Sequence, residues 1–438
     1  SKVLHSWPRG ARGAYCCVLS NPQCLDIGSL LGDPRQSPFA AALRSSTYLL
    51  VIPNNACSPY SRIWCVYEAF LAYSWDKAIY TAAPPIRRPW AHPLGVFLTY
   101  AASVCSAMLA LCFAWPEAAE AAHGVVMLVM VAWYATILAP SSDCAIGLYY
   151  FSGMFAGVGT AFNLVLIASK GRALHDPLLG QIPPQVWILH ILVGTASLAA
   201  CASDWARDRQ LYLESVQLRK EFTGSVLDAK SSEPADRERI LADIQASGSL
   251  AQVNQAVEVL LQAGMSTPSL RAATARGGDV RGAARWSLGH LLAVLLVFVV
   301  VPVDNSIVDN SCGGPWSFVP MLNGVEGIAW FFIFATRQHD QRSFLGTVGC
   351  KVAAAYMVVF VLWMGAALLM NLPMDRRNCV PDAIGAFGLG PCMLALAVAG
   401  IEGTANVPVI GPRLVTFALT FGRRGSRPPA TPAHVDKV

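Results

Sequence analysis

The sequence predicts a polytopic α-helical membrane protein with about eight transmembrane helices in two sets of four, a small N-terminal α/β domain and a helical cytosolic linker. Three observations predict this fold class. The 438 residues are 54% hydrophobic and only 13% charged, whereas soluble domains carry roughly 25% charged residues. The charges are spaced so that long uncharged windows remain between them. The first 83 residues, by contrast, alternate between short apolar runs and helix-like segments.

The N-terminal domain is assigned to residues 1–90. Short apolar, aromatic-rich runs bounded by turn residues predict strands over 13–20 and 47–53, and a weaker run predicts one over 77–82. Helices are predicted between them, over 37–46 and 60–73. This strand–helix alternation is typical of a parallel sheet with helices on its faces.

The helix predicted over residues 60–73 carries the most distinctive side chains of this domain. Its core face is formed by residues at i, i+4, i+7 and i+8, namely Ile63, Tyr67, Phe70 and Leu71. Trp64 and Glu68 lie one turn apart in the adjacent row. This geometry either raises the affinity of the Glu68 carboxylate for its proton by desolvation or lets it bond the hydroxyls of a ligand.

The stretch "ALRSSTYLLVIPNNACSPYSRIWCVYEAF" resembles the second half of a Toll/interleukin-1 receptor homology (TIR) domain, in which a Trp-Cys-x-x-Glu-type helix follows a strand. It is more closely similar to TIR-like segments of protist proteins with an "RIWCVYE"-type helix. The resemblance covers roughly residues 13–83 and extends to the pieces Asn21-Pro22-Gln23, Asp33-Pro34-Arg35, Pro38-Phe39 and Ala42-Leu43. The membrane region carries no such resemblance.

The resemblance implies roles for the residues of this helix. In NAD-cleaving TIR domains the Glu of the motif engages the nicotinamide ribose and is catalytic, which makes Glu68 the catalytic candidate and NAD the cofactor of that alternative; otherwise no cofactor is expected. The interaction or structural candidates of the motif are Arg62, Trp64, Cys65 and Tyr67. Before Gly13 no further strand is predicted, so a cleft formed by half a domain is expected to leave the Glu68 carboxylate in water.

The apolar regions are assigned to residues 91–204 and 286–421, with four helices in each. The uncharged windows, each able to hold about 20 residues, are Arg88–Glu117, Glu120–Asp143, Asp143–Lys170, Asp176–Asp204, Arg285–Asp304, Lys351–Asp375 and Asp382–Glu402. An eighth window, Trp316–Thr336, spans only if Glu326 lies inside it. Helices are predicted because lipid leaves no partner for open backbone groups and no period-2 pattern favours a barrel.

The basic residues predict the orientation. Arginines precede the windows Arg88–Glu117 and Arg285–Asp304 and follow the windows Trp316–Thr336 and Asp382–Glu402, which places both termini in the cytosol. The tail, residues 422–438, is basic and Pro-rich and is expected to rest on anionic lipid headgroups. The net charge of +5 is too small to indicate nucleic-acid binding. The sequence does not indicate which membrane holds the chain, and because it starts at Ser1, residues upstream are expected.

The interval over residues 205–285 is predicted to be a cytosolic helical linker. Residues 204–222 continue the fourth helix into water. Apolar stripes follow at Ile240, Leu241 and Ile244 and at Val253, Val257, Leu260 and Leu261, and Gly264 is the predicted C-cap. Such stripes must pack on each other, on the N-terminal domain or on a partner, so protein partners are expected through the TIR-like domain and residues 204–264.

Polar residues inside the windows are candidates for function or for helix contacts. Glu326 and Asn323 lie in the eighth window, whereas His190 and Asn163 are expected to make hydrogen bonds between helices. Small residues at Gly153, Gly157 and Gly159 predict close helix packing. Cys312 and Cys379 fall in loops assigned to one side, where a disulfide or two buried thiols are both consistent with the sequence. No Cys/His spacing indicates a metal site.

Three functions remain open from the sequence. The first is a membrane protein whose TIR-like segment is a non-catalytic interaction or signalling module. The second is a channel or transporter with regulatory cytosolic segments, motivated by Glu326 and the four-plus-four arrangement. The third is a membrane-tethered NAD hydrolase that uses Glu68.

Overall fold

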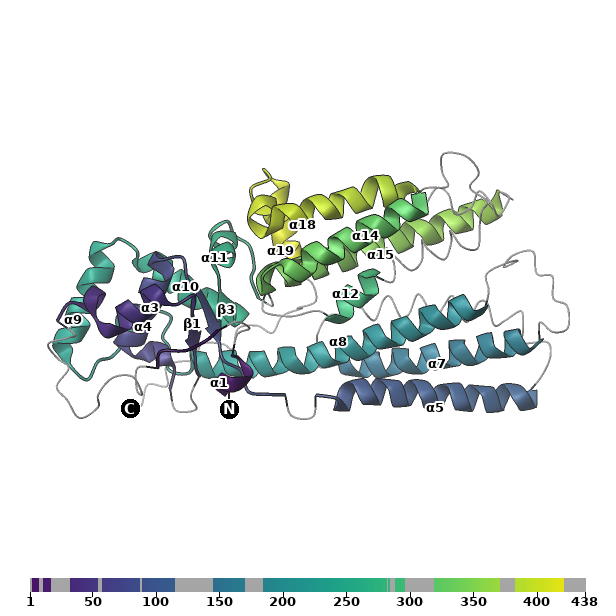
Figure 1. Cartoon of the computed structure of the whole chain (residues 1–438), viewed down its shortest axis with the longest axis horizontal. Helices are drawn as coiled ribbons and strands as arrows, with labels where there is room; N and C mark the ends of the chain where they lie inside the picture. The colour runs from purple at the N-terminus through teal and green to yellow at the C-terminus, as the bar shows by residue number, and fades with distance from the viewer. Residues whose placement is uncertain are drawn as a thin grey trace, which may run out of the picture. The chain divides into compact units, whose positions relative to one another are not determined.

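The computed structural model describes residues 2–7, 11–16, 32–53, 57–86, 89–114, 145–169, 184–281, 283, 288–295, 319–370 and 383–420. Helices predominate among them, and the chain divides into two compact units (Figure 1). Unit 1 contains residues 1–87, 207–285 and 401–419, and unit 2 contains residues 88–206, 286–400 and 420–438.

The sheet of unit 1 has three strands in the order β1-β2-β3. β1 (Tyr48–Val51) pairs in parallel with β2 (Ala78–Thr81), with Leu49 opposite Ile79. The strands predicted over 47–53 and 77–82 are therefore confirmed. The sheet is nevertheless mixed rather than parallel, because β3 (Met265–Ser266) pairs antiparallel to β2 with Ser266 opposite Ile79. Of the strand predicted over 13–20, residues 13–16 have no strand conformation and 17–20 lie outside the described residues.

The helices of unit 1 begin and end where local signals place them. Ser37 caps α3 (Pro38–Ser45), its hydroxyl accepting from the Ala40 amide, and Pro38 occupies the first turn. α10 (Leu250–Ala263) ends at Gly264, whose φ of 73° is the left-handed C-cap predicted from the sequence. Other helical elements of this unit are α1 (Lys2–His5), η2 (Pro34–Gln36), η3 (Pro59–Ser61), α4 (Ile63–Ser74), η4 (Val226–Asp228), α9 (Pro234–Ala246) and α11 (Pro268–Ala275).

The core of unit 1 joins the N-terminal segment to the interval assigned as a linker. α4 packs against both α9 and α10. The shared core includes the buried side chains of Tyr67, Phe70, Ile240, Ile244, Val257 and Leu260. Each large side chain enclosed in this way stabilises the fold by about 1.5–3 kcal/mol. Of the three packing alternatives open for the linker stripes, the structure shows packing on the N-terminal domain.

The other helical elements lie in unit 2 or run between the two units. They are α5 (Ala91–Ala114), α7 (Ala145–Ser169), α8 (Pro184–Arg219), α12 (Leu288–Leu295), α14 (Val319–Thr336), α15 (His339–Leu369), the π-helical turn η7 (Gly385–Leu389), α18 (Gly390–Ala405) and α19 (Ile410–Thr420). Residues 207–219 of α8, 401–405 of α18 and 410–419 of α19 belong to unit 1. Every predicted window holds a helix in its described part except Glu120–Asp143, which lies outside the described residues. The helix expected to continue from the fourth window into water is α8, and this expectation is confirmed.

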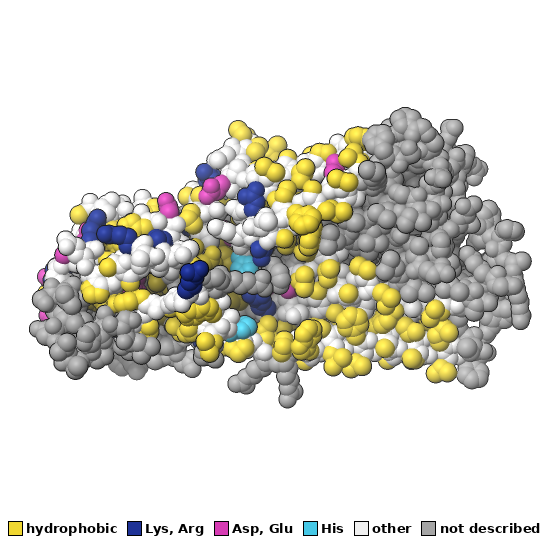
Figure 2. All heavy atoms as spheres, in the orientation of Figure 1, with side chains coloured by type: hydrophobic (Ala, Val, Ile, Leu, Met, Phe, Trp, Pro, Cys, Tyr) yellow, Lys and Arg dark blue, Asp and Glu magenta, His cyan; other side chains and the backbone are white. Residues whose placement is uncertain are grey.

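Within the described residues, three helical stretches are long and apolar enough to cross a membrane: Ala91–Leu109, His339–Phe360 and Gly385–Ala405. The surface view shows many hydrophobic side chains exposed on unit 2 (Figure 2). On α5 these include Leu94 and Leu98, which are 55% and 60% exposed. A helix with such side chains on its outer face is typical of a lipid environment.

The contact between α5 and α7 depends on glycine. A Cβ at Gly157 would collide with the Tyr100 carbonyl and lie 2.8 Å from the Ser103 Cβ, and one at Gly153 would lie 3.1 Å from the Val96 carbonyl oxygen. The predicted role of Gly153 and Gly157 in close packing is confirmed, because only a residue without Cβ allows the backbones this near.

Candidate functional site

The helix that carries the Trp-Cys-x-x-Glu motif, α4, is held at its start by the chain that follows α8. The Ile63 amide donates to the Lys230 carbonyl at 2.9 Å, and the Lys230 amide donates to the Ser61 carbonyl at 2.7 Å. The Ser58 amide donates to the Lys220 carbonyl at 3.0 Å. These backbone bonds fix the motif from a segment far along the chain.

The indole of Trp64 forms a hydrogen bond with α9. Its Nε1–H donates to the Asp236 carboxylate at 3.1 Å, and its ring lies 5.2 Å from that of Phe39, centroid to centroid. The Asp236 carboxylate also pairs with Arg239. Trp64 therefore connects α3, α4 and α9, which is the structural role among the alternatives open for it.

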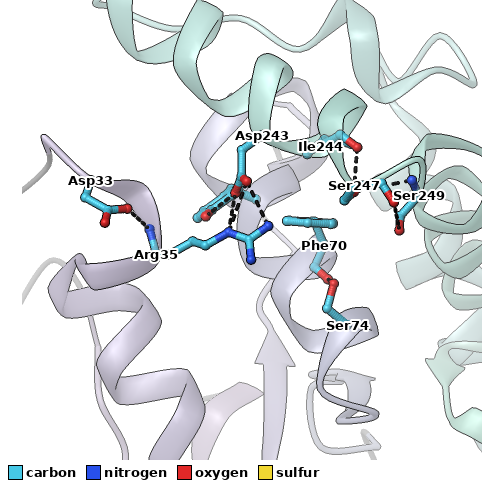
Figure 3. Close-up of polar contacts among 9 residues, drawn as sticks. Asp33, Arg35, Phe70, Ser74, Asp243, Ile244, Ser247 and Ser249 are labelled. Atoms are coloured by element: carbon cyan, nitrogen blue, oxygen red, sulfur yellow. Dashed lines mark hydrogen bonds and ion pairs between the residues drawn. The ribbon is translucent and has the colours of Figure 1, made fainter.

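The phenol of Tyr67 forms a hydrogen bond with the same helix. Its O–H donates to the Asp243 carboxylate at 2.8 Å, and this carboxylate also accepts from Arg35, with Nη2 at 2.8 Å and Nε at 3.0 Å (Figure 3). The Arg35 backbone is held in turn by Asp33, whose side chain accepts from the Arg35 amide at 2.9 Å. We call Arg35, Tyr67 and Asp243 the carboxylate clamp. Burial, together with the Asp243 hydrogen bond, raises the pKa of Tyr67.

The acidic partners on α9 were not identified from the sequence. Asp236 and Asp243 are seven residues apart and flank Ile240, so they lie near one face of the helix. That spacing was the available signal, but it does not reveal which distant donors the two carboxylates meet.

Replacing Asp243 with alanine is expected to destabilise unit 1 by about 2–3 kcal/mol, because Tyr67 and Arg35 then lose a charged acceptor. Denaturant unfolding of the purified full chain measures the effect. The matched control is Glu238→Ala, an exposed acid on the same helix, which is expected to change the free energy of unfolding by less than about 0.5 kcal/mol. Equal losses in both variants would contradict the clamp.

Glu68 lies beside a buried phenol. The carboxyl is half-buried, and burial raises its pKa to about 7, while the positive charge of Arg62 acts in the lowering direction. Among the described residues it has no hydrogen-bond partner. Tyr60 is 1% exposed, and its hydroxyl likewise finds no partner within the described part. The pKa of Tyr60 is raised by burial and then by the charges of Cys65 and Glu68.

The expectation that half a domain leaves Glu68 in water is therefore wrong, and the alternative of desolvation holds. The reason is that residues 207–285 join the N-terminal segment in one unit. A carboxyl that titrates near neutral pH can donate or accept a proton under physiological conditions. The chemistry available at this position is that of a general acid or base.

The Glu68→Gln variant is expected to lose part of the pH dependence of stability. The carboxyl titrates near 4.5 in the unfolded chain and at about 7 in the folded chain. Between pH 4.5 and about 7 the folded state binds more protons than the unfolded state, so the free energy of unfolding falls as the pH rises through this range. Below pH 4.5 the Glu68 carboxyl is protonated in both states and does not affect stability. Unfolding measured across the window should show a shallower fall in Glu68→Gln than in the unchanged chain, whereas Glu238→Gln should keep the original slope.

The other predicted site residues are spread over the chain. Arg62 is exposed at the start of α4, and Cys65 is half-buried on it. Glu326 lies on α14 against η7, in unit 2. Asn323, His190 and Asn163 belong to α14, α8 and α7, but their side chains lie outside the description, as do Cys312 and Cys379 altogether. Among the predicted site residues whose side chains are described, the structure brings together only the motif residues of α4.

No group of three or more His, Cys, Asp or Glu side chains in the described ranges is arranged to hold a metal ion. A comparison of the chain with protein-family models, curated proteins and solved structures gives no match.

Proposed function

We propose that this chain is a multi-pass membrane protein whose unit 1 is a cytosolic, non-catalytic TIR-like interaction or signalling module. The observation that carries this proposal is the use of the aromatic motif residues. Trp64 and Tyr67 donate hydrogen bonds to Asp236 and Asp243 of α9, respectively. The motif residues therefore stabilise unit 1, and this structural role accounts for their presence without a substrate.

A different row of α4 is available to a partner. Arg62, Cys65 and Glu68 recur every three residues and are exposed or half-buried, which places them along one side of the helix. An exposed cation next to a titratable carboxyl favours a polar protein surface as the partner. We call these three residues the α4 row and assign it as the docking surface of the module.

The membrane part of the proposal is supported by the three apolar stretches and by the helices in the remaining windows. In the proposed arrangement about eight helices span the bilayer, because each window holds about 20 apolar residues. Both termini and residues 204–285 then lie in the cytosol, as the basic residues at the window ends favour.

The docking proposal is tested by placing a photo-crosslinking amino acid at position 68 or, as control, at the exposed position 252 of α10 in the full chain in cells. One discrete protein adduct at position 68 but not at 252 is the expected result. Adducts at neither position, or the same adducts at both, would remove the support for the α4 row.

A second candidate is a membrane-tethered NAD hydrolase, and one observation favours it: the pKa of Glu68 is raised to about 7 by burial. Such a carboxyl suits general acid–base chemistry. Incubating the full chain with NAD, beside Glu68→Ala, decides between the two. The interaction module predicts no NAD consumption by either protein, whereas consumption that disappears in Glu68→Ala would establish the hydrolase.

A further inference from the structure

Glu326 presents an enclosed oxygen to a π-helical turn. α14, which carries Glu326, packs against η7 in unit 2. The Oε2 atom of Glu326 is buried and has no hydrogen-bond partner in the described part of the chain. One turn further along α14, Trp330 is 3% exposed, and its Nε1–H is also without a partner there. Two unpaired polar atoms on one face of an apolar helix are costly, and such sites usually have a function.

The turn opposite is shaped to receive the carboxyl. η7 consists of Gly385, Ala386, Phe387, Gly388 and Leu389, and Gly390 follows it. A Cβ at Gly390 would collide with Oε2 and would lie 2.8 Å from the Glu326 Cδ and 3.1 Å from the Gly385 carbonyl oxygen. A side chain at position 390 would therefore displace the carboxyl, which rests directly against the backbone at the end of a π-helical turn, an irregularity often found at functional sites.

The group next to the Glu326 Oε2 determines whether the protonated or the ionised carboxyl can form a hydrogen bond there. Oε2 and the Gly385 carbonyl oxygen both face the space that a Cβ at Gly390 would fill. Both are acceptors if Glu326 is ionised, so the enclosed Oε2 gains no hydrogen bond from this carbonyl and is shielded from water, although the side chain as a whole is half-buried. With a proton on Oε2 the carboxyl becomes a donor, and the Gly385 carbonyl oxygen is an acceptor that faces the same space.

From this geometry we propose that Glu326 is a proton-binding site in the apolar helical unit, with the Gly385 carbonyl as acceptor of the bound proton. The site goes beyond the interaction module, and it is the element that a proton-coupled channel or transporter would use.

Few titratable or charged residues lie on the elements around Glu326. α14 packs against η7, α15 and α12. η7 contains no titratable residue, and the His290 side chain of α12 lies outside the description. The titratable residues that the structure describes on α15 and α18 are His339, Asp340, Arg342, Cys350, Lys351, Tyr356, Cys392 and Glu402. None of these is joined to Glu326 by a hydrogen bond or ion pair within the described residues.

The experiment uses an apolar carbodiimide, which reacts with carboxyl groups that carry a proton, on the full chain in lipid vesicles. At about pH 8, well above the ordinary carboxyl range, we expect an adduct at Glu326 and none at Glu402, an exposed carboxyl on α18. Peptide mass mapping locates the adduct. Glu326→Gln should remove it. An unlabelled Glu326 in the unchanged chain would overturn the proposal.

Two glycine variants separate the π-turn contact from general packing. Gly390→Ala places a methyl group where Oε2 lies, whereas a Cβ at Gly388 in the same turn meets nothing within 4 Å. We expect Gly390→Ala to reduce labelling about tenfold and Gly388→Ala to leave it unchanged. Equal labelling of the two variants overturns the assigned acceptor. If Gly390→Ala fails to fold, the infrared band of a protonated carboxyl, present in the unchanged chain and absent from Glu326→Gln, decides the question; its absence from both refutes the site.

Discussion

Replacing Leu260 with aspartate is expected to unfold unit 1 as a whole, including β1 and α4, although these elements lie far earlier in the chain. Leu260 is 0% exposed in the core that α10 shares with α4. A carboxylate there has no partner and no water, so we expect a loss of more than about 4 kcal/mol. This is a large fraction of the 5–15 kcal/mol that typically stabilises a domain.

Limited trypsin digestion of the full chain measures the effect of Leu260→Asp. Lys77, just before β2, donates from Nζ to the Ser46 carbonyl and is protected only while the sheet is formed. We expect rapid cleavage after Lys77 in Leu260→Asp and slow cleavage in Gln252→Asp, an exposed position on the same helix. If Lys77 stayed protected in Leu260→Asp, residues 205–285 would not be part of the N-terminal core.

Replacing Gly157 with leucine is expected to separate α5 from α7. The leucine side chain would collide with the Tyr100 carbonyl oxygen and with the Ser103 Cβ. Neither atom can be moved by a change of side-chain rotamer. Overpacking of this kind costs about 3 kcal/mol. The hydrogen bond between the Tyr100 hydroxyl and Thr160 Oγ1, 3.0 Å long, should be lost with the contact.

Amide hydrogen exchange along α5, measured in the full chain in lipid, reports the separation of the two helices. Gly157→Leu should speed exchange in α5. Gly147→Leu is the matched control, because a Cβ at Gly147, on the same helix α7, meets nothing within 4 Å. Similar exchange in both variants would show that the α5–α7 contact does not depend on position 157.

The two proposals for the chain place different demands on it. The interaction module needs only the surface of unit 1, and its motif residues stabilise that unit through Asp236 and Asp243. The proton site needs Glu326 and the η7 turn of unit 2. Each has its own experiment, so the failure of one leaves the other standing.

Local patterns in the sequence were enough to predict most of the elements. Short apolar runs bounded by turn residues predicted β1 and β2, the i, i+4 spacing predicted α4 and α10, and Gly264 marked the end of α10. These features depend on residues within one or two turns of each other, where backbone preference and side-chain period act directly. The same reasoning identified the glycines of α7.

Only the tertiary structure decided which distant segments meet. β3 is two residues long and carries no period that would reveal it, and its antiparallel pairing with β2 makes the sheet mixed. The partners of Tyr67 and Glu326, Asp243 and the Gly385–Gly390 turn, lie far away in sequence. Local sequence determines the elements, but contacts between remote segments determine desolvation and hydrogen bonding, and these set the chemistry of a carboxyl group.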